Sequence, residues 1–338
     1  MSGFRSCSVR LQPDLAVRLK PASFEMEVSM SRLIVRRFAV MVLTGVIFAA
    51  FSWGVSVQAQ QSPTVFLSVV DRSGAPVTNL QPSEVKLVLD DMACESKKVE
   101  PIGWPLKLTV LIDNGDAIVS SLTSLREGLR RFLAEIPEGV ETELLSYSPQ
   151  PRWIVRPTTD RQQLVKGVDL VAPNSGSGAK FLDAVGEAVN RIAREKGDSF
   201  HTIMVITTNG PEGSGGNVNG IVEKMQRQLT ERPATVHVAM VAISTTQSVG
   251  RVSGATQTQI GVMLTKMTGG RYENIAIANR LPVLLTEYGK QIARSHLLQS
   301  RQYRLSCDKS PSKAPKISVS TSNPSVADLT LTRDGLIP

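Results

Sequence analysis

The sequence predicts an α/β fold: a doubly wound, mostly parallel sheet with a small flanking β module built from both ends of the mature chain. Residues 108–112 form a nearly continuous apolar run, as expected for a strand that helices cover on both faces. Further strand-like and helix-like segments alternate as far as residue 299, which indicates right-handed crossover connections. The segments 60–105 and 300–338 are strand-like and contain no helical pattern.

The N-terminal region is expected to direct export. Residues 1–29 have no periodic pattern and precede a plausible start at Met30, so they are an extension or a mis-assigned start. Residues 30–59 combine a basic start, the apolar run 38–57 and small residues before Ala59, which is typical of a secretory signal peptide cleaved after Ala59. We therefore expect a secreted or periplasmic, cell-envelope protein. The alternative is an uncleaved membrane anchor, because about 20 apolar residues can span a bilayer.

The charge of the chain argues against a nucleic-acid partner. The 338 residues include 38 Lys and Arg against 30 Asp and Glu, a formal net charge of +8. Half of this excess lies in residues 1–59, and the remaining basic residues are evenly spread and not clustered on one segment.

The two strand-like ends are expected to build one β module between them. The first contains "TVFLSVVD" and "EVKLVLDD", and the second contains "QYRLSC", "KISVSTS" and "VADLTLT". Neither end can bury a core alone. Two cysteines remain after removal of Cys7 with the leader, and an even number in an oxidising compartment favours pairing. We predict a disulfide between Cys94 and Cys307; the alternative is two separate buried thiols.

Residues 106–299 carry the alternating pattern of the predicted α/β domain. The first strand is followed by a helix in which apolar residues from Leu122 to Ile136 recur at helical spacing. The segments "ETELLSYS" and "WIVRP" alternate partly, which predicts an antiparallel edge pair. Strands are then predicted at "HTIMVITTNG", "TVHVAMVAI" and "RYENI". Helical spacing predicts helices around Leu164–Val171, Leu182–Ile192, Val218–Leu229, Leu284–Ile292 and, as a short helix, Ile260–Met267.

The candidate site lies at the carboxyl ends of the predicted strands, where open α/β sheets bind ligands. Three segments meet this description: Asp113–Ala117, Ser175–Lys180 and Thr207–Gly210.

At these segments the chain resembles the von Willebrand factor A domain, and its layout from Val65 to about Leu331 is similar to that of secreted bacterial proteins described as VWFA-related. The resemblance rests on "LTVLID" with its short turn and helix, "GAKFLDAVGEAV", "IMVITTNG", "MTGGRYENI" and "QIARSHLLQSRQYRLS", in that order and spacing. It implies a von Willebrand A, Rossmann-like fold for residues 106–299 and a protein-binding or adhesion function.

The resemblance also implies a metal-ion-dependent adhesion site, and this sequence departs from its pattern. Only the first aspartate, Asp113, is kept. The two serine positions hold Gly115 and Ala117, the threonine position holds Ala179, and the second carboxylate position holds Asn209. Mg²⁺ requires several oxygen ligands, with carboxylates to offset its charge. We therefore expect no bound metal, and Asp113 is expected to hydrogen-bond the loops.

Three neighbouring polar residues, Asn114, Asp116 and Ser177, complete the rim of this degenerate site. Asp116 and Ser177 do not occupy ligand positions, although they could compensate in a rebuilt site. The whole rim, from Asp113 to Asn209, is the predicted protein-contact surface.

Catalytic motifs are missing from the sequence. His201 and His237 lie in or beside predicted buried strands and His296 lies near the end of the last helix, so no histidine–carboxylate pair is expected. The sequence contains no nucleophile elbow, no H-E-x-x-H and no Walker A motif. We expect no catalytic residue, no enzyme activity and no cofactor.

The sequence thus predicts a non-enzymatic, extracytoplasmic protein-binding module whose partner lies at or outside the cell envelope. One alternative is a metal-dependent adhesion protein with a rebuilt divalent-metal site. A second alternative is a small-molecule-binding α/β enzyme, which the missing glycine fingerprint after the first strand disfavours. The sequence does not identify the partner.

Overall fold

The computed structural model describes residues 64–174, 176, 178–210, 212–242, 255–308 and 315–337. The predicted signal segment lies outside the described residues. The strands are β1 Thr64–Val70, β2 Val85–Leu89, β3 Met92–Ala93, β4 Lys97–Pro101, β5 Leu106–Ile112, β6 Glu141–Ser146, β7 Arg152–Thr158, β8 Phe200–Thr208, β9 Thr235–Val241, β10 Tyr272–Ile275, β11 Tyr303–Cys307, β12 Ile317–Thr321 and β13 Asp328–Thr332. The helices are α2 Leu122–Glu135, α3 Arg161–Asp169, α4 Phe181–Arg194, α5 Val218–Glu231, α6 Ala255–Thr268 and α7 Leu281–Gln299, with 3₁₀ turns η1 Pro82–Glu84, η2 Asp116–Ser121 and η3 Ala278–Arg280.

The central sheet has the predicted architecture. Its six strands follow the order β10-β9-β8-β5-β6-β7, and β5 lies at the centre between β6 and β8. All neighbours pair in parallel except β7, which pairs antiparallel with β6. The predicted fold class and the predicted antiparallel edge pair are both confirmed.

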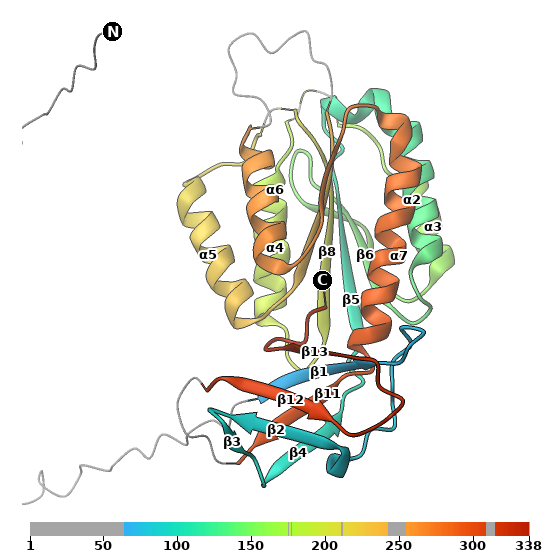
Figure 1. Cartoon of the computed structure of the whole chain (residues 1–338). Helices are drawn as coiled ribbons and strands as arrows, with labels where there is room; N and C mark the ends of the chain where they lie inside the picture. The colour runs from blue at the N-terminus through green and yellow to red at the C-terminus, as the bar shows by residue number, and fades with distance from the viewer. Residues whose placement is uncertain are drawn as a thin grey trace, which may run out of the picture. The chain divides into compact units, whose positions relative to one another are not determined.

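Helices cover both faces of this sheet, as Figure 1 shows. The alternate residues of β5 separate the two cores: Leu108 and Val110 face α2, α3 and α7, whereas Leu111 faces α4, α5 and α6. This explains why the sequence of β5 is apolar almost throughout, since each side chain enters one core or the other. Both cores together hold the strand ends in fixed positions.

Two helical positions differ from the sequence expectation. The predicted short helix at Ile260–Met267 is α6, which has 14 residues, and Met267 is 41% exposed. The buried face of α6 is centred on Gly261, Leu264 and Thr265, and Met267 in the last turn lies off that face. Val218 is exposed because it is the first residue of α5.

The two ends of the described chain build the β module together, as predicted. One sheet has the order β13-β1-β11-β4, so each N-terminal strand lies beside a C-terminal one. The second sheet has the order β12-β2-β3. Apolar residues from both sheets share one core that includes Leu67, Leu87 and Leu305. The sequence had indicated one module, and the structure divides it into two packed sheets.

The predicted disulfide is present. Cys94 follows β3 and Cys307 ends β11, with their Cα atoms 6.1 Å apart, so the bond joins the two sheets of the β module. The bonded cysteines are separated by 213 positions in the sequence. Residues 60–338 form one compact unit, so the boundaries expected at 105/106 and 299/300 stay predictions.

Candidate functional site

Polar residues gather where three neighbouring strands end. Asp113 follows β5, Tyr147 and Ser148 follow β6, and Thr208 is the last residue of β8. Because these strands are parallel, their carboxyl ends lie at one edge of the sheet. The sequence predicted this edge through Asp113 and Thr207–Gly210, and it missed the contribution of β6.

Asp113 is buried at this edge, and both oxygens of its carboxylate accept hydrogen bonds from neighbouring donors. Its Oδ1 accepts a hydrogen bond from the backbone of Gly115 at 2.9 Å. Its Oδ2 accepts bonds from the backbone N–H of Thr208 at 3.2 Å and from the Thr208 hydroxyl at 2.8 Å. Burial raises the pKa of Asp113, and these three hydrogen bonds act in the opposite direction. Asp113 therefore ties the loop after β5 to the end of β8.

Asn114 is also buried, and it ties the same loop to two others. Its Oδ1 accepts a bond from the backbone N–H of Ser148 at 2.8 Å. Its Nδ2 donates to the carbonyl oxygen of Ala172 at 3.1 Å. The backbone N–H of Asn174 donates to the carbonyl oxygen of Asn114 at 2.7 Å. The side chain of Asn114 is thus used within the protein and is not available to a partner.

Asp116 is the exposed acidic residue of this rim. Its Oδ1 accepts a bond from the backbone N–H of Gly176 at 2.7 Å, which links the start of η2 to the loop before α4. Ser177, predicted as part of the rim, lies outside the described residues. Asn209 is half-buried, and its backbone N–H donates to Val241 at 3.2 Å.

Two alanines belong to the same loops as these polar residues. Ala179 is 3% exposed, and its carbonyl oxygen accepts a bond from Gly213 at 2.6 Å. Ala117 lies against Gly210, because a Cβ added to Gly210 would come within 2.8 Å of the Cβ of Ala117. Neither alanine provides a side-chain oxygen at the edge.

Glu212 and Tyr147 are two titratable residues of this region that the sequence reasoning missed. A parallel β-bridge joins Ala179 to Glu212. Burial raises the pKa of Glu212, while hydrogen bonds from Ser214 and from the first backbone N–H groups of α4 lower it. Burial, together with the charges of Asp113 and Glu212, raises the pKa of Tyr147 well above its ordinary value. The polar "YS" at the end of the predicted segment "ETELLSYS" was the available sequence signal for Tyr147.

These residues do not fit the oxygen shell that a divalent metal requires. Mg²⁺ needs near-octahedral coordination by oxygens, several of them charged or hydroxylic. Both oxygens of Asp113 already accept bonds from the chain, and alanines stand at two of the implied ligand positions. Within the described ranges, no group of three or more His, Cys, Asp or Glu side chains is arranged to hold a metal ion.

Exposed apolar side chains lie beside the polar edge. Val119 in η2 is 49% exposed, Ile277 before η3 is 59% exposed and Val283 in the first turn of α7 is 55% exposed. Both η2 and η3 contact α2, and α2 packs along α7, so these residues surround the N-terminal ends of two adjacent helices. We call Asp116, Val119, Ile277 and Val283 the upper surface.

One histidine does approach a carboxylate, contrary to the sequence expectation. The Nε2 of His201 lies 3.7 Å from Glu195 and 2.9 Å from the hydroxyl of Ser199. Burial lowers the pKa of His201 to about 4, which keeps its ring neutral at pH 7. The serine and the glutamate share one ring nitrogen, whereas a catalytic triad places them on different nitrogens. The contact is therefore not a triad.

Comparisons with known proteins concern the fold. No protein-family model matches the chain, and no curated protein matches it. Among solved structures, the chain is similar to a von Willebrand factor type A protein from Catenulispora acidiphila, with TM-score 0.45, 10% identity, and 70% of this chain and 51% of that chain covered. This chain therefore spans about half the length of that protein. The fold is similar to that of von Willebrand factor A domains.

Two further von Willebrand A-like structures each match about half of this chain. The conserved hypothetical protein BatB from Bacteroides thetaiotaomicron matches with TM-score 0.42 and 14% identity, covering 56% of this chain and 100% of that chain. The von Willebrand domain of the type V pili tip protein Mfa5 from Porphyromonas gingivalis matches with TM-score 0.42 and 11% identity, covering 56% of this chain and 96% of that chain. At these identities the likeness concerns the fold alone.

Proposed function

We propose that this protein is a non-enzymatic, extracytoplasmic protein-binding module that binds its partner without a metal, through the upper surface. The observation that carries the proposal is the set of three hydrogen bonds that the two oxygens of Asp113 accept from Gly115 and Thr208. The carboxylate of Asp113 therefore positions the loop after β5 relative to the end of β8. The exposed neighbours Asp116 and Val119 then contact the partner.

The chemistry of the upper surface supports a protein partner. Val119, Ile277 and Val283 offer apolar area, and Asp116 adds one negative charge at its margin. Such a combination suits a partner that presents apolar side chains with a basic residue beside them. The extracytoplasmic location rests on the N-terminal sequence pattern, which lies outside the described residues. No helix within the described residues is long and apolar enough to cross a membrane.

A capture experiment with matched variants tests the surface. The full chain is immobilised and exposed to the envelope fraction of its host, and bound proteins are compared with those retained by the double variant Val119→Ser/Ile277→Ser. We expect the variant to lose a partner that the wild type retains. Leu297→Ser is the control, because Leu297 is 48% exposed near the other end of α7. If Leu297→Ser loses the same partner to the same extent, the upper surface is not the binding surface.

A thermal titration tests the absence of a metal. A ligand that binds only the folded state raises the melting temperature. We expect millimolar Mg²⁺, Mn²⁺ or Ca²⁺ to leave the melting temperature of the wild type unchanged. A rise that Asp113→Ala abolishes would favour the metal-dependent adhesion alternative.

A further inference from the structure

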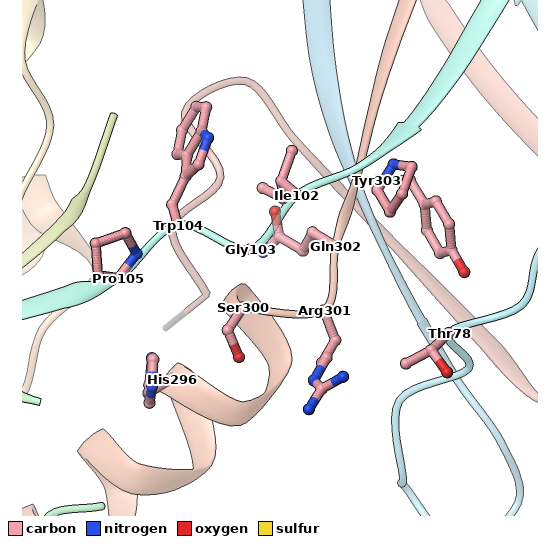
Figure 2. Close-up of a pocket in the computed structure, with 11 residues that line it drawn as sticks. Thr78, Ile102, Gly103, Trp104, Pro105, His296, Ser300, Arg301, Gln302 and Tyr303 are labelled. Carbon is pink, nitrogen blue, oxygen red and sulfur yellow. The ribbon is translucent and has the colours of Figure 1, made fainter. Parts of the chain in front are cut away.

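A cavity lies at the opposite end of the central sheet from the upper surface. It has a volume of about 540 Å³ and is lined by the segment that leads into β5, by the end of α7 and by the start of β11. Figure 2 shows its residues, with Trp104 and Pro105 on one side and Thr78 on the other. β5 begins directly after Pro105, and its seven residues extend about 23 Å before Asp113 at about 3.3 Å per residue. The two sites are therefore separate.

The lining of this cavity is unbalanced in charge. Among the described residues that line it, Arg301 carries a positive charge and none carries a carboxylate. Arg301 is exposed and forms neither an ion pair nor a side-chain hydrogen bond with a described residue. In the view of Figure 2, its guanidinium group lies between Ser300 and Thr78. Since a guanidinium offers a fork of donors that matches a carboxylate, the cavity favours an anion.

Two other groups of the lining have unused hydrogen-bonding capacity. The Nδ1 atom of His296 is buried and has no hydrogen-bond partner. The indole N–H of Trp104 makes no hydrogen bond with a described residue, although its ring is held between Phe66 and Phe200 at centroid distances of 5.3 Å each. The Nδ1 atom of His296 is enclosed by the protein, so it does not face the cavity.

The remaining walls are apolar and rigid. Pro101, Ile102 and Pro105 line the cavity beside Trp104, and these side chains lose little conformational freedom when a ligand packs against them. Small-molecule sites have this character: a mostly apolar concavity of about 300–1,000 Å³ with a few convergent polar groups.

We propose that this cavity binds a small organic carboxylate with an aromatic or cyclic body. The carboxylate pairs with the guanidinium of Arg301, and the body packs against Trp104 and the prolines. His296 lines the cavity with a ring that stays neutral, because burial lowers its pKa. The same chemistry is offered by a free acid or by the C-terminal carboxylate of a peptide that ends in an aromatic residue.

Calorimetric titration of the full chain with phenylacetate tests the proposal. We expect phenylacetate to bind, and the neutral 2-phenylacetamide to bind at least about tenfold more weakly, because a hydrogen bond to a charged group is worth about 1.5–3 kcal/mol. Phenethylamine, which carries a positive charge, should not bind. The peptide Gly-Gly-Phe, with a free or an amidated C-terminus, distinguishes a free acid from a peptide C-terminus as the natural ligand. If the peptide with the free C-terminus binds more tightly than phenylacetate, the site is assigned to peptide C-termini.

Two variants place the binding in this cavity. Arg301→Ala should weaken phenylacetate binding at least about tenfold. Gly103→Leu should abolish it, since a Cβ at Gly103 meets no atom within 4 Å and the added side chain grows into open space. Arg304→Ala is the charge-matched control: Arg304 pairs with Glu100 at 2.7 Å on the neighbouring strand and does not line the cavity.

The outcomes separate clearly. The proposal is supported if Arg301→Ala and Gly103→Leu lose phenylacetate binding and Arg304→Ala retains it. The proposal is overturned if millimolar phenylacetate in tenfold excess over the protein gives no heat of binding. It is also overturned if 2-phenylacetamide binds with equal affinity, or if Gly103→Leu binds phenylacetate as the wild type does. Melting curves of each variant show whether a loss of binding comes from unfolding.

Discussion

At the scale of single residues, the candidate site is organised by two buried side chains that act on the backbone. Asp113 and Asn114 together bond to Gly115, Ser148, Ala172 and Thr208. The bond to Gly115 lies within the loop after β5, and the other bonds join this loop to the end of β8, to Ser148 after β6 and to Ala172. The exposed residues can form a surface because these buried ones fix the loops beneath it.

The raised pKa of Asp113 predicts a pH effect on stability. Burial lifts its pKa in the folded state above the ordinary value of 3.8, so the folded state holds the proton more tightly than the unfolded state. The resulting contribution to stability is present below pH 3.8 and is lost as pH rises through the folded-state pKa. Asp113→Asn removes this titration. We expect the unfolding free energy of the wild type to fall relative to the variant across this window.

Urea unfolding of both proteins between about pH 3.5 and pH 7 measures the effect. Other titrating groups are common to the two proteins and cancel in the difference. A difference that stays constant with pH would show that Asp113 does not titrate above its ordinary range.

Asn114 gives a second prediction at this scale. Asn114→Ala leaves the N–H of Ser148 and the carbonyl oxygen of Ala172 without their partners, at a cost of about 1–3 kcal/mol in unfolding free energy. Asp116→Ala is the matched control, because Asp116 is exposed and its side chain accepts one hydrogen bond from the backbone. We expect this variant to lose about 1 kcal/mol or less of unfolding free energy. Chemical denaturation measures both; equal losses would contradict the different roles assigned to them.

At the scale of elements, the approach of α6 and β10 to β9 depends on a glycine. Gly270 connects α6 to β10, and its N–H donates to Thr265 at 2.9 Å. A Cβ at this position would overlap the backbone carbonyl oxygen of Val236 in β9. The carbonyl oxygen of Val236 cannot change position by a rotamer change, as a flexible side chain can. Strand β9 itself would therefore have to move.

We therefore expect Gly270→Ala to reduce the unfolding free energy by about 1–3 kcal/mol, the usual cost of overpacking. Gly215→Ala is the control, since a Cβ there meets no atom within 4 Å. Denaturant midpoints compare the two variants. A Gly270→Ala protein as stable as the wild type would show that β9 shifts at little cost.

At the scale of the whole molecule, the disulfide joins the two ends of the described chain. Cys94→Ala/Cys307→Ala opens a loop of 213 positions, and the chain-entropy model gives an upper value of about 5 kcal/mol for its contribution. We expect a large fall in melting temperature for the double variant and an equal fall for wild type under a reductant. Unchanged melting in both would show that the β module does not depend on the bond.

The targeting prediction also concerns the whole chain. Exported protein should begin at Gln60, because Ala59 ends the pattern of a cleavable signal. N-terminal sequencing of material from outside the cytoplasm decides this. An intact run 38–57 in that material would indicate a retained anchor.

The sequence by itself determined the order of strands and helices in the central domain and the carboxyl edge where Asp113 lies. These follow from local periodicity, because a strand buried on both faces and an amphipathic helix each have a distinct apolar pattern. The pairing of Cys94 with Cys307 was also accessible, since both ends of the chain needed a common β module.

Only the tertiary structure decided what surrounds each side chain. Asn114 and Asp116 are equally polar in the sequence, yet one is buried with two side-chain hydrogen bonds and the other is exposed. The division of the β module into two sheets and the cavity beside Trp104 likewise depend on strand register and on segments nearly 200 positions apart. Burial and partners are set by such non-local packing, which no local pattern of residues encodes.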